Sequence, residues 1–69
     1  MTEGTRIKIE GQKVKAENGA FEITAIIPQP DRENYYLYKR VTKAGKVSQS
    51  TKNLRGAWGK RLEKIAEVI

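Results

Sequence analysis

The sequence contains neither cysteine nor histidine. Without cysteine there are no disulfides and no thiolate metal ligands, and without histidine a zinc site would have to rely on carboxylates alone. The usual general base and the most reactive nucleophile of enzymes are missing with them, and no glycine-rich phosphate-binding loop is present. We therefore expect a protein that is not an enzyme and that holds no metal or other cofactor.

Long apolar runs are also missing. No run approaches the ~20 residues that cross a bilayer, and the first residues lack the segments of a secretory signal. We expect a cytoplasmic protein without a membrane partner. The 69 residues predict one small basic domain, residues 1–69. A domain of this length buries roughly 60% of its unfolded surface. Its core must be well packed or completed by a second copy, which makes a homodimer possible, and no small-molecule substrate is expected.

Acidic side chains are absent from a long stretch of the chain. Between Asn34 and Leu62 there are eight basic side chains and no acidic one, whereas the first 33 residues have five basic and six acidic. The net charge of +6 therefore arises in the second half. A block of one sign that includes Tyr36, Tyr38 and Trp58 indicates a surface that binds a polyanion. The eight are Lys39, Arg40, Lys43, Lys46, Lys52, Arg55, Lys60 and Arg61.

The first third of the chain alternates polar and apolar residues. Residues 6–16 alternate on both sides of Gly11, and a period of two predicts half-buried strands. Asn18-Gly19 then favours a two-residue hairpin turn of type I′. Closing that turn sets Val14 opposite Ile23. The strand from residue 21 to 27 is followed by a predicted loop over residues 28–34, which contains both prolines of the chain.

Two further strands and a helix are predicted in the second half. Residues 35–42 alternate, and a loop over 43–45 with a left-handed Gly45 would place Val41 opposite Val47 in a strand over 46–51. From Asn53 the period changes to three and four, which predicts an amphipathic helix. Its apolar stripe consists of Leu54, Ala57, Trp58, Leu62, Ile65, Ala66 and Ile69.

These elements predict an α+β fold. We expect a five-stranded antiparallel meander, either an open twisted sheet or a small SH3-like barrel, with one C-terminal amphipathic helix that covers one face. The predicted inward set is Ile7, Ile9, Val14, Ala16, Phe21, Ile23, Ala25, Ile27, Leu37, Val41 and Val47. On this assignment Tyr36, Tyr38 and Arg40 point outward.

The predicted outward face combines cations, hydroxyls and phenol rings. Cations neutralise phosphates, and tyrosine rings stack on bases or lie along sugars. The face therefore favours a nucleic-acid platform, although an ordinary solvated sheet face is the simpler alternative. The candidate nucleic-acid-binding residues are Lys13, Lys15, Tyr36, Tyr38, Arg40, Lys43, Lys46, Arg55, Lys60 and Arg61.

The segment from Arg55 to Arg61 has two interpretations. Gly56 and Gly59, flanked by cations at a helix start, would let a phosphate approach the backbone. The alternative is that Trp58 is a core anchor and that the glycines relieve crowding against the sheet, which is the more common fate of an aromatic residue in a helix stripe.

A hairpin, a three-stranded sheet and a C-terminal helix in a short basic chain resemble the layout of the small chromatin proteins of certain archaea. In that family the three-stranded sheet lies on duplex DNA, and apolar side chains wedge a base step. The resemblance implies that residues 20–27, 35–42 and 46–51 form the binding sheet. Its outward side has tyrosines and an arginine in place of a clear apolar wedge, although Ile26 could serve as one. It is a resemblance of layout and not of residue motif. The helix-backed sheets of some phage integrases and of sheet-and-helix single-strand-binding cofactors are similar to the same degree.

The sequence thus predicts a non-enzymatic nucleic-acid-binding protein, more readily for DNA than for RNA, in a chromatin-like, accessory or regulatory role. The alternative is a small protein-interaction module, an inhibitor or subunit, that docks an acidic protein partner. Pairing of tyrosines with cations favours the first.

Overall fold

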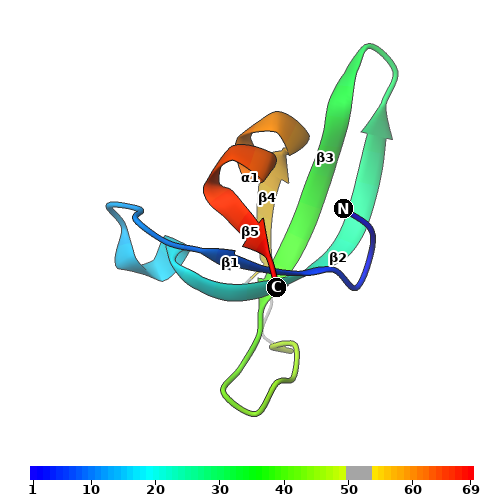
Figure 1. Ribbon diagram of the computed structural model, residues 1–69. Coiled ribbons are helices and arrows are strands. Elements are labelled where there is room, and N and C mark those ends of the chain that lie inside the picture. The colour runs from blue at the N-terminus through cyan, green and yellow to red at the C-terminus, as the bar shows by residue number, and fades with distance from the viewer. Residues whose placement is uncertain (50–53) are drawn as a thin grey trace.

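The computed structural model describes residues 1–49 and 54–69 (Figure 1). It is an α+β fold with five antiparallel strands in the spatial order β4-β3-β2-β1-β5 and one helix near the C-terminus. The elements are β1 (Arg6–Ile9), β2 (Gly19–Gln29), β3 (Arg32–Arg40), β4 (Leu54–Trp58), α1 (Gly59–Ile65) and β5 (Ala66–Val68). The sheet curls but stays open, because β4 and β5 form its two edges. The predicted fold class is therefore confirmed.

The predicted hairpin at Asn18-Gly19 is wrong. β1 pairs directly with β2, with Ile7 opposite Phe21, and residues 10–18 form a connection that includes one 3₁₀ turn. Asn18 is extended, with φ −94° and ψ 152°, so the type I′ turn does not form. Its side chain instead accepts a hydrogen bond from the Gln12 amide at 2.9 Å and donates to the Gln12 and Val14 carbonyls. This local bonding of an asparagine side chain competes with strand pairing.

The loop predicted over residues 28–34 is much shorter in the structure. β2 continues to Gln29 and β3 begins at Arg32, so that the two strands form a long hairpin. Pro28 lies at a shift of register between Ile27 and Gln29, where the missing N–H breaks no regular ladder.

The turn after β3 agrees with the prediction at its base. Val41 and Val47 form an isolated antiparallel bridge, and Gly45 has a φ of +79°. Residues 46–49 do not continue as a strand beyond that bridge. The last part of the strand predicted over 46–51 lies outside the described residues.

The predicted long helix is wrong in extent. Residues 54–58 form β4, which pairs with β3, and residues 66–68 form β5, which pairs with β1. Only the seven residues of α1 between them are helical. Leu54, Gly56 and Trp58 alternate with Arg55 and Ala57, so this stretch satisfies a period of two as well. Pairing with the open edge of β3 provides backbone hydrogen bonds without the cost of placing two glycines in a helix.

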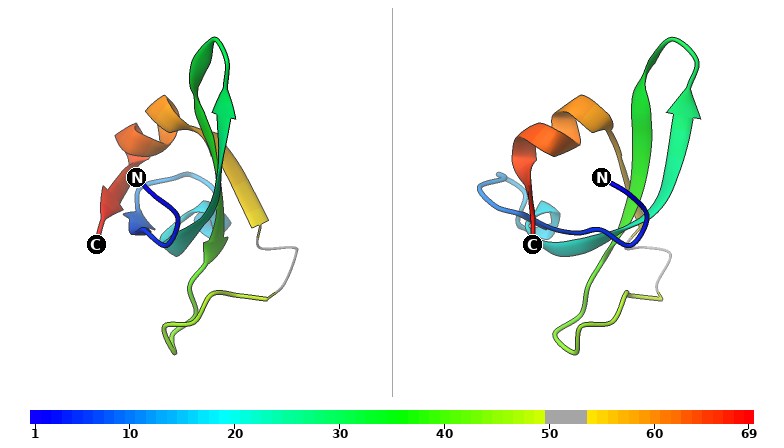
Figure 2. Two further views of the ribbon diagram at one scale, coloured as in Figure 1. Left: turned by 90° about the vertical axis from the view of Figure 1, so that its right-hand side faces the viewer. Right: turned by 45° about the vertical axis from the view of Figure 1, so that its right-hand side comes forward.

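The core lies between the curled sheet and α1. Ile7, Ile9, Phe21, Ile23 and Leu62 are completely or almost completely buried. Figure 2 (left) shows α1, β5 and β1 on one side of the long β2–β3 hairpin, with the other side of the hairpin uncovered. We call the covered side the inner face and the uncovered side of β2, β3 and β4 the outer face. In the described residues no helix is long and apolar enough to cross a membrane.

Candidate nucleic-acid interface

Both candidate tyrosines of the sheet lie on the inner face, so their predicted exposure is wrong. Tyr36 and Tyr38 retain only 6% and 8% of their accessible surface, and Tyr38 meets the Phe21 ring edge-on at 5.2 Å. The cause is the register of β3 on the regular first half of β2: Tyr38 lies opposite the buried Ile23, and Tyr36 follows on the same side of β3. A shift of register also lies at Thr24, between Ile23 and Ala25. It reverses the parity of β2, so that Ile26 and not Ile27 faces the core next to Tyr36.

The rest of the predicted inward set changes accordingly. Val14 and Ile27 are exposed at 57% and 41%, and Ala16 is exposed as well. Ala25 and Leu37 are cross-strand partners on the outer face. The correct members are those of β1 and of the first half of β2, where the strands are regular.

Arg40 is also on the inner face, where it fixes the β1–β2 connection. Its guanidinium donates to the Asn18 carbonyl at 3.0 Å and to the Ala16 carbonyl at 2.5 Å, and it stacks over the Phe21 ring at 4.8 Å. Gly19 leaves room for this group, because a Cβ at that position would collide with it. The prediction that Arg40 faces solvent, free to meet a phosphate, is wrong.

Arg55 lies beside Tyr38 on β4 and is half-buried. One of its terminal nitrogens donates to the Ala16 carbonyl at 3.4 Å, while its Nε is buried without an acceptor among the described residues. Burial raises the pKa of the Tyr38 hydroxyl above its usual value, and the positive charge of Arg55 partly opposes that shift. Arg40 and Arg55 therefore meet at the Ala16 carbonyl, and Tyr38 lies beside Arg55 on the inner face and not on an open sheet surface.

The remaining candidates are exposed but lie on three separate segments. Lys13 and Lys15 belong to the β1–β2 connection, Lys43 and Lys46 to the turn after β3, and Lys60 and Arg61 to α1. These six cations do not share one face with the two tyrosines.

The outer face carries a continuous apolar and aromatic surface. Cross-strand partners project to the same side of a sheet, so the register defines its rows. Ile27, Tyr35 and Trp58 form one row, Ala25, Leu37 and Gly56 the next, and Glu22, Lys39 and Leu54 the third. Ile27 and Leu54 are 41% and 43% exposed, and no described helix or strand covers this side (Figure 2).

Tyr35, Trp58 and Arg32 form an ordered cluster at one end of this surface. The Tyr35 and Trp58 rings meet edge-on with centroids 4.9 Å apart, and the Arg32 guanidinium lies 3.6 Å from the Trp58 centroid. Gly56 makes the arrangement possible, since a Cβ there would lie 2.7 and 2.8 Å from two Tyr35 ring atoms. Gly59 likewise leaves space for the Tyr36 ring, 3.0 Å from its absent Cβ. The glycines thus relieve crowding, as the second interpretation of this segment predicted, whereas Trp58 is not a core anchor.

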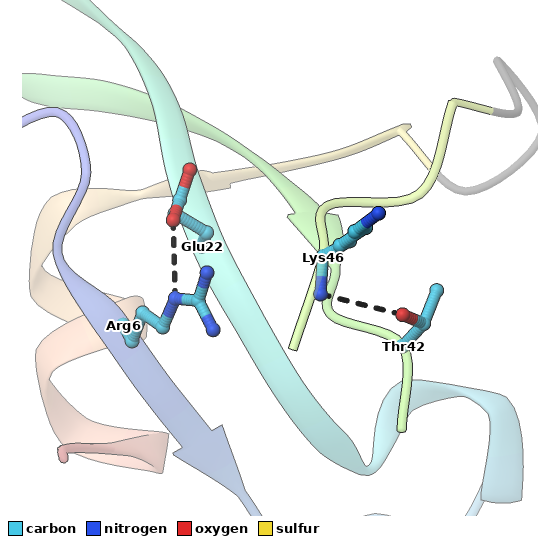
Figure 3. Close-up of polar contacts among 4 residues, drawn as sticks. All are labelled: Arg6, Glu22, Thr42 and Lys46. Carbon is cyan, nitrogen blue, oxygen red and sulfur yellow. Dashed lines mark hydrogen bonds and ion pairs between the residues drawn. The ribbon is translucent and has the colours of Figure 1, made fainter. Parts of the chain in front are cut away.

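Cations lie at the other end of the outer face. The Arg6 Nε donates to Glu22 at 3.1 Å, and the Lys46 amide donates to Thr42 Oγ1 at 3.4 Å within the adjacent turn (Figure 3). The Arg6 guanidinium also approaches Gly45 of that turn. Lys39 projects from the sheet beside Glu22, so the carboxylate of this row is compensated by Arg6 while Lys39 adds positive charge.

The alternation of residues 35–42 predicts Tyr35 and Lys39 on the same side as Leu37, which belongs to the predicted inward set, so the residues of the outer face were not predicted. One signal was available. Lys39 would have been a lysine facing the core without an expected acidic partner, which proteins avoid. The bulge at Thr24 had no comparable signal.

The residues described include no cluster of acidic side chains that could hold a metal ion. No protein-family model, curated protein or solved structure matches the chain.

Proposed function

We propose that the chain binds nucleic acid, DNA more readily than RNA, through the outer face of β2, β3 and β4. It acts without catalysis, in a chromatin-like, accessory or regulatory role, and the nucleic-acid partner implies a cytoplasmic location. The main support is the uncovered surface of Ile27, Tyr35, Leu37 and Trp58, which has cations at both ends.

The apolar and aromatic part of this surface suits the non-charged parts of a nucleic acid. Tyrosine and tryptophan rings pack on bases and sugars at about 1–3 kcal/mol per base when they stack. The edge-on contact of Tyr35 with Trp58 and the guanidinium over Trp58 hold both rings in place before binding. A fixed surface loses less conformational entropy on association than a mobile one.

The cations that border the surface suit the phosphates. Arg32 lies at the aromatic end, Lys39 at the other, and Lys43 and Lys46 on the adjacent turn. Four phosphate contacts on duplex DNA predict a slope of about −3 to −4 when the logarithm of affinity is plotted against that of salt.

The test compares two substitutions of the same chemistry. Lys39→Gln removes a charge from the outer face, and Lys64→Gln removes one from the exposed side of α1, on the covered side of the sheet. Fluorescence anisotropy with a labelled duplex across a salt series should show that Lys39→Gln weakens binding and reduces the slope by about 0.9. Lys64→Gln should leave both nearly unchanged. Equal effects of the two substitutions would show that only net charge matters, and the outer face would not be the interface.

A further inference from the structure

A cleft of about 230 Å³ runs along the free edge of β4. No residue of the third row of the outer face lines it. Its walls include four consecutive residues of β4, Arg55–Trp58, which project alternately to both faces of the sheet. Gln12 and Glu17 of the β1–β2 connection and Arg61 of α1 complete the opening. Since the lining includes both faces of one strand, the cleft follows the strand edge.

The cleft presents donors that have no acceptor. The buried Arg55 Nε makes no hydrogen bond within the described residues, and burial of a polar group without a partner costs about 1–3 kcal/mol. Tyr38 also lines the cleft, and no described residue is a hydrogen-bond partner of its hydroxyl. Arg61 contributes a second guanidinium to the same opening, against the single carboxylate of Glu17. An oxyanion in the cleft would lie between the two guanidinium groups and be attracted by both positive charges, while the Arg55 Nε itself stays covered.

The backbone of β4 is a second, independent feature of this cleft. β4 pairs with β3 on one side only and is an edge of the sheet, so its outward amides and carbonyls have no strand partner in the described part of the chain. An extended peptide adds to such an edge through main-chain hydrogen bonds, and its alternate side chains enter neighbouring pockets. The β1–β2 connection opposite β4 is held by Asn18 and Arg40, so the cleft is fixed before a ligand enters.

We propose that an extended acidic peptide segment of a partner protein adds to β4 as a sixth strand and places a carboxylate between Arg55 and Arg61. Ile9, Ala57 and Ile65 are apolar members of the lining, which suits a peptide with β-branched residues beside its acidic one. The cleft shares Tyr35, Gly56 and Trp58 with the outer face, but the proposal rests on Arg55, Arg61 and the backbone edge of β4 and not on the nucleic-acid interface.

The test is a selection from a random peptide library on the immobilised protein, followed by NMR of the ¹⁵N-labelled chain with the best peptide. The expected peptides have an acidic residue at a fixed position within a β-branched stretch, and they shift the amides of Gly56, Ala57 and Trp58 together with the Arg55 Nε–H signal. Replacing the acidic residue of the peptide with its amide should weaken binding about tenfold or more.

Variants of the protein separate charge recognition from folding. Arg61→Gln is exposed and should weaken the peptide about tenfold, whereas Lys64→Gln, which removes the same charge from the next turn of α1, should not change its affinity. Arg55→Gln should have the larger effect. Peptides without an acidic consensus, or a pattern of shifts away from β4, would overturn the proposal. The same would follow if a short single-stranded DNA shifted the Arg55 Nε–H signal at lower concentration than the peptide does, because the cleft would then bind phosphate. Shifts of Gly56 and Trp58 without that of Arg55 are expected from nucleic acid on the outer face.

Discussion

At the scale of single residues, a glycine determines where an aromatic ring can lie. Gly56 has ordinary strand geometry and is not required for its backbone conformation. Gly56 matters because it has no side chain, so that the Tyr35 ring can lie over it and contact the Trp58 ring. The structure thus explains a glycine that was an anomaly in the predicted helix, and it links this glycine to the aromatic cluster of the outer face.

Gly56→Ala should destabilise the fold by about 1–2 kcal/mol, because the new methyl group displaces the Tyr35 ring. In a Tyr35→Ala background the same substitution should cost much less, since the ring is gone. Chemical denaturation of the four proteins of this double-mutant cycle measures the coupling. Additive effects of the two substitutions would show that the ring does not lie over Gly56.

Tyr38 predicts a specific pH dependence of stability. Because burial raises its pKa above the usual value of 10.0, the unfolded chain loses the phenolic proton at lower pH than the folded chain. The stabilising contribution is complete below about pH 10 and is lost as the pH rises through the folded-state pKa. The free energy of unfolding of Tyr38→Phe should therefore fall less steeply above pH 10 than that of the wild type. Parallel curves would contradict the raised pKa.

At the scale of elements, the sequence predicted the α+β class because alternation and helical periodicity are local properties. It could not predict which strand pairs with which. The connection between β1 and β2 alternates like a strand, yet the Asn18 side chain holds it as a loop. Residues 54–58 fit a helix stripe and a strand equally well, and the unpaired edge of β3 decided between them. Whether such a segment becomes a loop, a helix or a strand depends on contacts with residues that are distant in the sequence, which a short stretch of sequence does not include.

The assignment of faces failed for a similar reason. The first half of β2 was assigned correctly, and one bulge at Thr24 then exchanged the two faces beyond it. Tyr35 and Tyr36 follow each other, so β3 presents an aromatic ring to either side and its sequence does not indicate which one is buried. The candidate site moved as a consequence from the even-numbered to the odd-numbered residues of β3.

Arg40 gives a prediction that separates a structural role, in which it holds the β1–β2 connection, from the predicted role of binding a phosphate. Arg40→Gln should lower the free energy of unfolding by about 1–3 kcal/mol, because two carbonyls lose a charged donor. Lys13→Gln, an exposed change in the same connection, should alter it by less than about 0.5 kcal/mol. Thermal melts of both variants provide the comparison. An Arg40→Gln protein as stable as the wild type would contradict the role assigned to this side chain.

At the scale of the whole molecule, the fold separates its two sides. α1, β1 and β5 close the inner face over a small apolar core, while the outer face of β2, β3 and β4 keeps aromatic and apolar side chains in contact with solvent. The proposed function rests on this exposed apolar surface and on Lys39, Lys43 and Lys46, the members of the basic segment that border it. Together they favour nucleic acid at the outer face.

The chain has a single tryptophan, Trp58, and it lies on that face. The most direct measurement is therefore its intrinsic fluorescence during titration with duplex DNA at low and at physiological salt. The proposed interface predicts a saturable change in Trp58 emission and an affinity that falls steeply as salt rises. Binding that leaves the emission of Trp58 unchanged, or no binding at low salt, would contradict it.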